Sequence, residues 1–254
     1  MSSSAPADTG VHWFRFSAPP EFYRLAGRLV PWSGGLAAML AVVGLYIAFF
    51  LAPTDAQQGE SYRIIFIHVP AAWMAMFLYV VMAFWSGVGL VFNTRLSAML
   101  ACAIAPTGAL MAFIALWTGS LWGRPAWGTY WVWDARLTST LILLFLYCGF
   151  IALHSAIDDP RRADKATAVL ALVGVVNVPI IYFSVQWWNT LHQGSSIRPG
   201  AVSIAAVMVT GMLVMVFAFW MYSIAAILHR ARSILLEREQ RSAWTQQAIA
   251  RERG

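Results

Sequence analysis

The stretch "SAMLACAIAPTGALMAFIALWTG", residues 97–119, holds no charged side chain over its whole length. An α-helix of about 20 apolar residues spans the hydrocarbon core of a bilayer. Lipid offers no hydrogen-bond partner, so only helices and closed barrels can cross it. Transmembrane strands are shorter and alternate apolar with polar residues, which this stretch does not. It therefore predicts a transmembrane helix.

Comparable apolar runs recur along the chain and give the same prediction. The others are residues 34–52, 66–92, 137–157, 166–186 and 201–228. The composition agrees, because 60% of the residues are hydrophobic and 11% charged, against roughly 45–50% and about 25% in soluble domains. We therefore expect an all-α integral membrane protein with six transmembrane helices and a Trp-rich loop on its outer face.

The distribution of Lys and Arg between the loops predicts the orientation. With six spans both termini share one side, and that side carries thirteen of the seventeen cations: Arg15, Arg24, Arg28, Arg95, Arg161, Arg162, Lys165, Arg230, Arg232, Arg238, Arg241, Arg251 and Arg253. The other side carries Arg63, Arg124, Arg136 and Arg198. Both termini are thus expected in the cytoplasm. The net charge of +6 follows from this topology and requires no nucleic-acid partner.

This topology divides the chain into three parts. Residues 1–31 form a cytoplasmic N-terminal segment, 32–228 the six-helix membrane domain, and 229–254 a cytoplasmic, helical C-terminal tail. The N-terminal segment is long for a signal peptide, so the first span is expected to be retained. Three loops then face outward: 53–65, 120–136 and 187–200.

Several activities are disfavoured by what the sequence lacks. Its only lysine, Lys165, stands in "DDPRRADKATA" without the glycine-rich loop of a Walker A motif, so the chain is not expected to be an ATPase. No C-x-x-C-H haem attachment motif occurs. Cys102 and Cys148 fall at different depths and are expected to stay unpaired. Few ionisable residues lie within the spans, which disfavours an ion-coupled carrier.

The second outer loop contains "WGTYWVWDARLTS", residues 127–139. A helix would place Trp127, Tyr130, Trp131 and Asp134 on one face, forming a platform along the membrane surface. Tryptophan and tyrosine are enriched at membrane interfaces in general, but this enrichment does not account for the charged residues beside the aromatic residues here. Guanidinium groups are well shaped to bind carboxylates. The outer-loop candidates for a flat, anionic ligand are Trp122, Trp127, Tyr130, Trp131, Trp133, Asp134, Arg63, Arg124, Arg136 and Arg198.

Two of the five histidines are expected on the outer side. His68, in "YRIIFIHVPAAW", precedes Pro70 and should lie just outside the regular second helix, since proline favours a first helical turn. His192 follows two tryptophans in "QWWNTLHQGSSIRPG". Each alone could be an ordinary interfacial residue, but two neutral imidazoles can fill both axial positions of a haem iron. His154 and His229 lie at cytoplasmic helix ends, where a structural role suffices.

The tryptophan-rich stretch resembles the WWD signature of the haem-handling proteins of cytochrome c maturation. The six spans, the flanking histidines and the length resemble the CcmC type, haem exporter protein C. The resemblance implies transiently bound haem b, with His68 and His192 as axial ligands of its iron. Trp127, Trp131, Trp133 and Asp134 match the signature, and Tyr130 stands where many members have tryptophan. Arg63 and Arg136 also fall where members have arginine.

The resemblance further implies partners and a location. These are an ABC-type ATPase subunit, a second six-span subunit, a small single-span subunit and a periplasmic haem chaperone of the CcmE type. The location is the bacterial inner membrane with the haem site facing the periplasm. We expect no enzymatic activity of the chain itself. A b-type cytochrome subunit for electron transfer and a haem-translocating permease remain as alternatives.

Overall fold

The computed structural model describes residues 18–188, 190–192, 197–198, 201–202 and 205–253. Within them, six helical segments are long and apolar enough to cross a membrane, which confirms the predicted multi-pass all-α fold. The segments are Pro19–Leu51, Glu60–Phe92, Arg95–Trp127, Ala135–Ser155, Pro160–Trp187 and Ala206–Arg238.

Three of the six segments are composite. The first joins α1 (Pro19–Tyr46) to a π-helical turn, η2 (Ile47–Leu51), and the second joins a 3₁₀ turn, η3 (Glu60–Ile64), to α2 (Ile65–Phe92). The fifth is broken into α5 (Pro160–Gly174) and α6 (Asn177–Trp187). The remaining elements are α3 (Arg95–Trp127), α4 (Ala135–Ser155), α7 (Ala206–Arg238), α8 (Ala243–Arg253) and a two-stranded pair, β1 (Ile197–Arg198) with β2 (Ala201–Val202).

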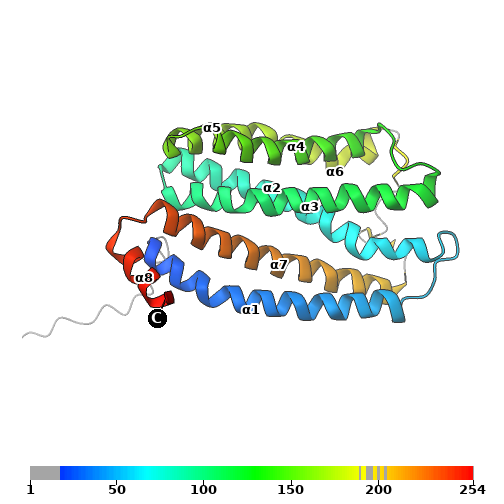
Figure 1. Ribbon diagram of the computed structural model, residues 1–254. Helices are drawn as coiled ribbons and strands as arrows, with labels where there is room; N and C mark the ends of the chain where they lie inside the picture. The colour runs from blue at the N-terminus through cyan, green and yellow to red at the C-terminus, as the bar shows by residue number, and fades with distance from the viewer. Residues whose placement is uncertain (1–17, 189, 193–196, 199–200, 203–204, 254) are drawn as a thin grey trace, which may run out of the picture.

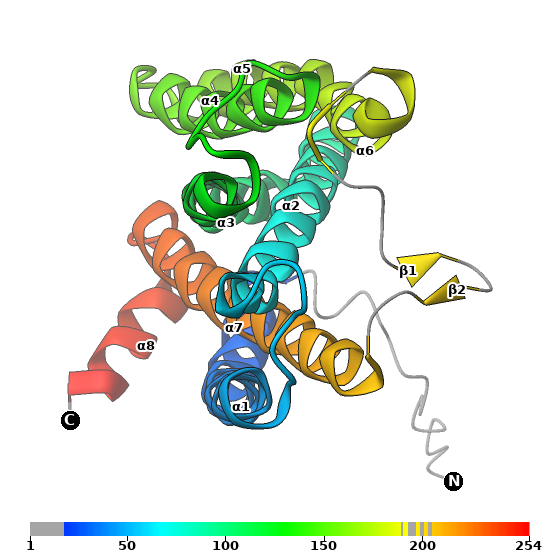
Figure 2. The ribbon, with the colours of Figure 1, turned by 90° about the vertical axis from the view of Figure 1, so that its right-hand side faces the viewer.

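The helices form three layers, which both ribbon views show (Figures 1 and 2). Helices α1 and α7 pack along each other in one outer layer, α2 and α3 form the middle, and α4, α5 and α6 form the other outer layer. Helix α2 runs obliquely across the bundle, so its first residues lie beside the last turns of α3 (Figure 2). This crossing brings residues that are distant in sequence together at one end.

Close contact between α3 and α4 depends on a glycine, Gly108. Tyr147 of α4 is fully buried, and its hydroxyl donates a hydrogen bond of 2.8 Å to the backbone carbonyl of Ala75. A Cβ atom at Gly108 would overlap the Tyr147 ring. The tyrosine therefore crosses α3 only because residue 108 is glycine.

The helices extend beyond the apolar runs that predicted them. Helix α1 begins at Pro19, well before residue 34, because proline is well placed in a first turn. Helix α7 begins at Ala206 and continues to Arg238, so residues 201–205 are not part of it. The C-terminal tail, expected as one helix, is interrupted between Arg238 and the start of α8 at Ala243.

The outer loop predicted at 120–136 is much shorter in the structure, and the helical platform predicted within it is wrong. Helix α3 continues to Trp127, and Gly128 ends it with a φ of 78°, donating its N–H to the carbonyl of Arg124. Glycine adopts this left-handed conformation without steric cost. Helix α4 starts only after Asp134. Residues 128–134 are therefore extended or bent, and their side chains do not share one helical face.

The prediction that His68 lies outside the regular second helix is also wrong. Helix α2 begins at Ile65, directly after the 3₁₀ turn, and includes both His68 and Pro70. Membrane helices tolerate an internal proline where neighbouring groups compensate for its missing donor. His68 thus lies in the first turns of α2, on a regular backbone.

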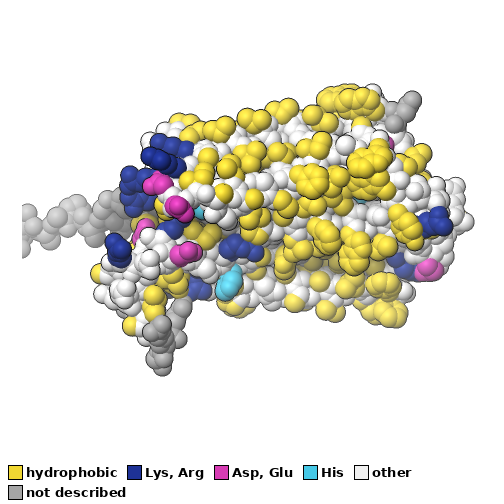
Figure 3. Space-filling model, turned by 45° about the horizontal axis from the view of Figure 1, so that its top comes forward, with side chains coloured by type: hydrophobic (Ala, Val, Ile, Leu, Met, Phe, Trp, Pro, Cys, Tyr) yellow, Lys and Arg dark blue, Asp and Glu magenta, His cyan; other side chains and the backbone are white. Residues whose placement is uncertain are grey.

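Charged side chains gather at the two ends of the bundle. The visible face is hydrophobic along its middle, and most of its Lys and Arg side chains cluster toward the end that carries the C-terminus (Figure 3). The end with the C-terminus is called the basic end below. The opposite end carries the loops that connect η2 to η3 and α3 to α4 (Figure 1).

We expect Gly108→Ala to destabilise the bundle by about 1–3 kcal/mol, because the added methyl group forces the buried Tyr147 ring out of its position. The melting temperature of the purified protein in detergent measures this effect. Gly35→Ala is the matched control, since a Cβ at this exposed helical glycine meets nothing within 4 Å. Equal melting temperatures for the two variants would contradict the packing argument.

Candidate functional site

His68 is held by a hydroxyl on the neighbouring helix. Its Nδ1 lies 3.1 Å from Oγ1 of Thr118 in α3. The Thr118 hydroxyl donates its single proton to the carbonyl of Ile114 at 2.6 Å, so its oxygen is left to accept from the imidazole. This bonding places the ring proton on Nδ1. The lone pair of Nε2 remains available to a ligand.

Two further residues of α3 surround the same imidazole. Gly119 makes room for it, since a Cβ there would lie 2.9 Å from Cε1 of His68. The Trp122 ring contacts it edge to face, with centroids 5.7 Å apart. Trp122 in turn donates from Nε1 to Gln58 Oε1 at 2.7 Å, which connects α3 to the segment between η2 and η3. His68 is therefore oriented by side chains from a different helix and fixed by a connection to a third segment.

His192 is held in the same way by a carboxylate. Its Nδ1 lies 3.4 Å from Oδ2 of Asp134, whose side chain is 8% exposed. The other oxygen of Asp134 accepts the backbone N–H of Leu137 at 2.7 Å and so caps α4. An ionised carboxylate can only accept, so Nδ1 of His192 is the donor and Nε2 stays free. The Trp127 ring packs edge-on against His192 at 4.9 Å.

Electrostatics connect both histidines to Arg136. A charge on Arg136 acts on His68 and on His192, and the two imidazoles act on each other. Burial lowers the pKa of His192, Arg136 lowers it further, and Asp134 opposes both. His192 is thus neutral at neutral pH, the form that can coordinate a metal. The structure brings His68, His192, Asp134 and Arg136 into one region.

The aromatic residues of the tryptophan-rich stretch divide into a half-buried set, Trp127 and Trp131, and an exposed set, Tyr130 and Trp133. Trp131 packs edge to face on Trp133 at 5.5 Å, and its buried Nε1 has no partner among the described residues. Trp133 and Tyr130 are 77% and 56% exposed. Trp187 and Trp188, at the end of α6, are also about half exposed. The aromatic rings in direct contact with the two histidines are therefore Trp122 and Trp127, and Tyr130, Trp133, Trp187 and Trp188 are exposed aromatic residues of the same end.

The remaining predicted arginines occupy different positions. Arg63, in η3, bonds to Glu60 and to the carbonyls of Ala48 and Ala52, which joins η3 to the π-helical turn η2 and its end. Arg124 donates to the carbonyl of Gly128 and lies over the Tyr130 ring, 5.6 Å from its centroid. The side chain of Arg198, in β1, lies outside the described part of the chain. Of the four, Arg136 is the one whose charge acts on both histidines.

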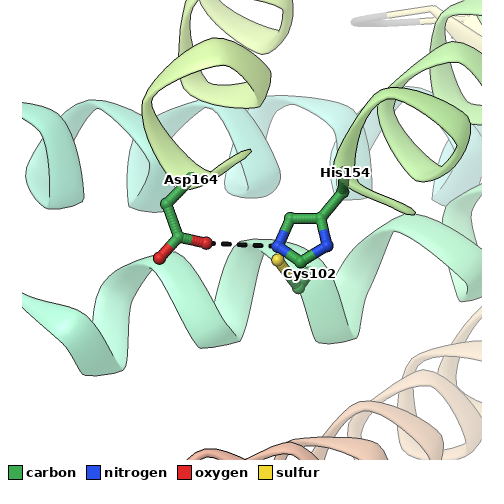
Figure 4. Close-up of side chains that lie close together, drawn as sticks. All are labelled: Cys102, His154 and Asp164. Carbon is green, nitrogen blue, oxygen red and sulfur yellow. Dashed lines mark hydrogen bonds and ion pairs between the residues drawn. The ribbon is translucent and has the colours of Figure 1, made fainter. Parts of the chain in front are cut away.

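A second polar cluster lies at the basic end, where only a structural role was predicted for His154. Its Nε2 lies 3.2 Å from Oδ1 of Asp164, and Cys102 is close to both (Figure 4). Arg238 binds both Asp164 oxygens at 2.7 and 2.8 Å and approaches His154 Nε2 at 2.9 Å. Because the guanidinium occupies the donor atoms that a metal would need, this cluster is an ion-pair network. Both cysteines are unpaired, as predicted.

Among the residues that orient or contact the histidines, Asp134, Trp122 and Trp127 were predicted from sequence, whereas Thr118 and Gln58 were not. Thr118 is separated from His68 by 50 residues and Gln58 from Trp122 by 64. Thr118 and Trp122, spaced four apart with Gly119 between them, share one face of α3. That spacing is a usable signal only once His68 is known to lie against α3.

The sequence profile described as CcmC, heme exporter protein C, matches residues 12–246. The chain belongs to this family. The heme exporter protein C of Escherichia coli strain K12 is 46% identical over 235 residues, which cover 92% of this chain and 95% of that protein. The protein of the same name from Bradyrhizobium diazoefficiens is 49% identical over 231 residues, covering 91% and 88%. The resemblance inferred from the tryptophan-rich stretch is thereby confirmed.

The similarity within the heme exporter protein C family extends to an organellar relative. A protein of Marchantia polymorpha named "Putative cytochrome c biosynthesis ccmC-like mitochondrial protein" is 41% identical over 202 residues, covering 80% of this chain and 86% of that protein. The family profile matches residues 12–246, and this range includes all six membrane-spanning segments. The family assignment therefore applies to the whole membrane bundle.

We expect Asp134→Asn to lower the pKa of His192 further, because it removes the one charge that raises this pKa and leaves burial and Arg136 unopposed. Asparagine is also a good N-cap, so α4 keeps its first turn. The pH dependence of carbethoxylation of His192, followed by peptide mass spectrometry, should show a midpoint below 6.5 in the wild type and lower still in the variant. Asp158→Asn, at the basic end, is the control, and an equal shift in it would refute the assignment.

Proposed function

We propose that this chain binds haem at the end opposite the basic end, with Nε2 of His68 and Nε2 of His192 as the two axial ligands of the iron. The proposal rests on one observation: the two imidazoles are hydrogen-bonded in the same way. Each commits Nδ1 to an acceptor, Thr118 or Asp134, and leaves Nε2 free. Hydrogen bonding of the remote nitrogen is the usual way in which proteins orient and strengthen metal-ligating histidines.

The surroundings of the histidines suit the rest of the ligand. When bound, haem supplies an iron with two open axial positions on a flat apolar ring that carries two carboxylates. Trp127 and Trp122 contact the histidines and offer apolar surface beside them. Arg136 supplies a positive charge, and the unpartnered Nε1 of Trp131 is a donor that a carboxylate would satisfy.

The biological role that we infer is delivery of this haem during maturation of c-type cytochromes. It is supported by relatives named heme exporter protein C and by one named for cytochrome c biosynthesis. In this proposal the basic end faces the cytoplasm and the histidine end the periplasm, following the distribution of Lys and Arg. The exposed Trp133 and Tyr130 would then face a periplasmic haem chaperone. An ATPase subunit, a second six-span subunit and a single-span subunit would complete the complex.

The histidine assignment is tested by spectroscopy of the purified chain. The wild type loaded with haem should show a low-spin spectrum with two axial imidazoles. His68→Ala and His192→Ala should each lose it, because one axial position then lacks a protein ligand. His229→Ala, an exposed histidine of α7 at the basic end, should keep it. A double variant of His68 and His192 with an unchanged low-spin spectrum would remove the basis of the proposal.

The role of Thr118 is separately testable. Thr118→Val keeps the shape but removes the acceptor for Nδ1 of His68, so haem affinity should fall by about 10–100-fold. Thr118→Ser restores a hydroxyl and should recover most of the affinity. The low-spin spectrum at saturating haem should persist in all three proteins, since both ligands remain. Equal affinities for the valine and serine variants would show that Thr118 only packs.

The electron-transfer alternative needs a second pair of histidines. His154 is the nearest candidate at the basic end, but its Nε2 already contacts Asp164 and Arg238. His229 is exposed on α7. No second pair of available imidazoles therefore occurs among the described residues, and one haem per chain is expected. Two haems per chain would favour the electron-transfer alternative.

A further inference from the structure

A cavity of about 360 Å³ opens between α2, α3 and α5 at the basic end, remote from the two histidines of the proposed haem site. Its rim carries Asn93, Thr94, Arg95, Arg161 and Lys165, all of them exposed. Buried side chains form its floor, among them Ser86 of α2. A volume of this size is within the range of small-molecule sites.

The charges that line this cavity favour an anion. Arg95, Arg161 and Lys165 supply three positive charges. Asp164 also lines the cavity, but Arg238 binds both of its oxygens and His154 approaches one of them (Figure 4). Asp159 is the N-cap residue of α5, and its side chain accepts a hydrogen bond of 2.8 Å from the backbone N–H of Arg162. Among the described residues, the arginine paired with Asp164 is Arg238, and no ion pair joins Arg95, Arg161 or Lys165 to a carboxylate.

The start of α3 adds backbone donors at the same rim. Helix α3 begins at Arg95, and its N-cap residue, Thr94, makes no side-chain capping bond. The Thr94 hydroxyl instead donates to Oγ of Ser97 at 2.7 Å. The first amides of an uncapped helix, together with its dipole, favour a negatively charged group.

An independent sign of a ligand comes from the cavity floor. Ser86 is 3% exposed, and its hydroxyl has no hydrogen-bond partner among the described residues. Buried hydroxyls normally find a partner, and Ser33, Thr118 and Ser139 in this chain bond to their own helix. Ser86 makes no such bond and lines the cavity. Its hydroxyl is therefore placed to bond a polar group that enters from the rim.

We propose that this cavity binds the phosphate-bearing headgroup of an anionic glycerophospholipid. Seven residues of helix separate Ser86 from Asn93, which is about 10 Å, so a phosphate at the cations can place a hydroxylated headgroup near Ser86. Val91 and Phe92, each 70% exposed, continue from the rim along α2 and offer apolar surface for acyl chains. Basic pockets between helices at the cytoplasmic surface are the usual form of such sites.

The test uses the full-length chain in neutral detergent, titrated with short-chain phosphatidylglycerol, short-chain phosphatidylcholine or inorganic phosphate. Lipid binding is read by native mass spectrometry and by the rise in melting temperature. We expect phosphatidylglycerol to bind at least tenfold more tightly than phosphatidylcholine. Each of Arg95→Gln, Arg161→Gln and Lys165→Gln should weaken binding about fivefold, and the triple variant about a hundredfold.

Two further variants separate the cavity from general surface charge. Arg162→Gln removes an exposed cation next to Arg161 that does not line the cavity, and it should bind phosphatidylglycerol as the wild type does. Ser86→Ala leaves the cations intact but should weaken phosphatidylglycerol binding about fivefold. Equal losses in Arg161→Gln and Arg162→Gln would overturn the proposal. So would inorganic phosphate that binds as tightly as phosphatidylglycerol, because the cavity would then be a site for the free anion.

Discussion

The bilayer restricts where this protein can place polar chemistry. Lipid offers no hydrogen-bond partner, so the backbone of the spans is committed to helices, and the side chains between α2, α3 and α4 are mostly apolar or small. Polar side chains that could bind a ligand are therefore gathered at the two ends of the bundle. His68 and His192 occupy one end, and the His154–Asp164–Arg238 network with most of the cations occupies the other.

At the histidine end, one carboxylate links folding to the site. One carboxylate oxygen of Asp134 caps the start of α4, and the other accepts a hydrogen bond from His192. Gly128 ends α3 a few residues earlier, so the stretch between them is released from helical geometry. Gly128 and Asp134, which end α3 and begin α4, thus set the positions of Tyr130, Trp131 and Trp133 and the orientation of His192. A helical platform could not have done this, because its side chains would follow one fixed spacing.

The two histidines use different partners to reach the same state. Thr118 accepts from His68 within the bundle, where a neutral hydroxyl suffices and a charge would be costly. Asp134 accepts from His192 nearer the surface, where its charge is offset by a backbone donor and by Arg136. His68 is part of the regular helix α2, whereas His192 lies in the connection that follows α6. This difference is compatible with the proposed delivery of haem, which requires the site both to hold and to release its ligand.

The six membrane helices, the unequal distribution of cations, the family and the presence of His68 and His192 at the same end of the bundle could all be predicted from the sequence. These depend on local composition, on apolar run length and on a contiguous motif. Three features become visible only in the folded chain: His68 lies within α2, Thr118 and Gln58 order the site, and Arg63 joins η3 to η2. The tertiary structure also revealed the cavity beneath Arg95 and Lys165. The contacts of Thr118 with His68 and of Gln58 with Trp122 depend on how distant segments pack, and no local pattern encodes a contact between residues 50 or 64 positions apart.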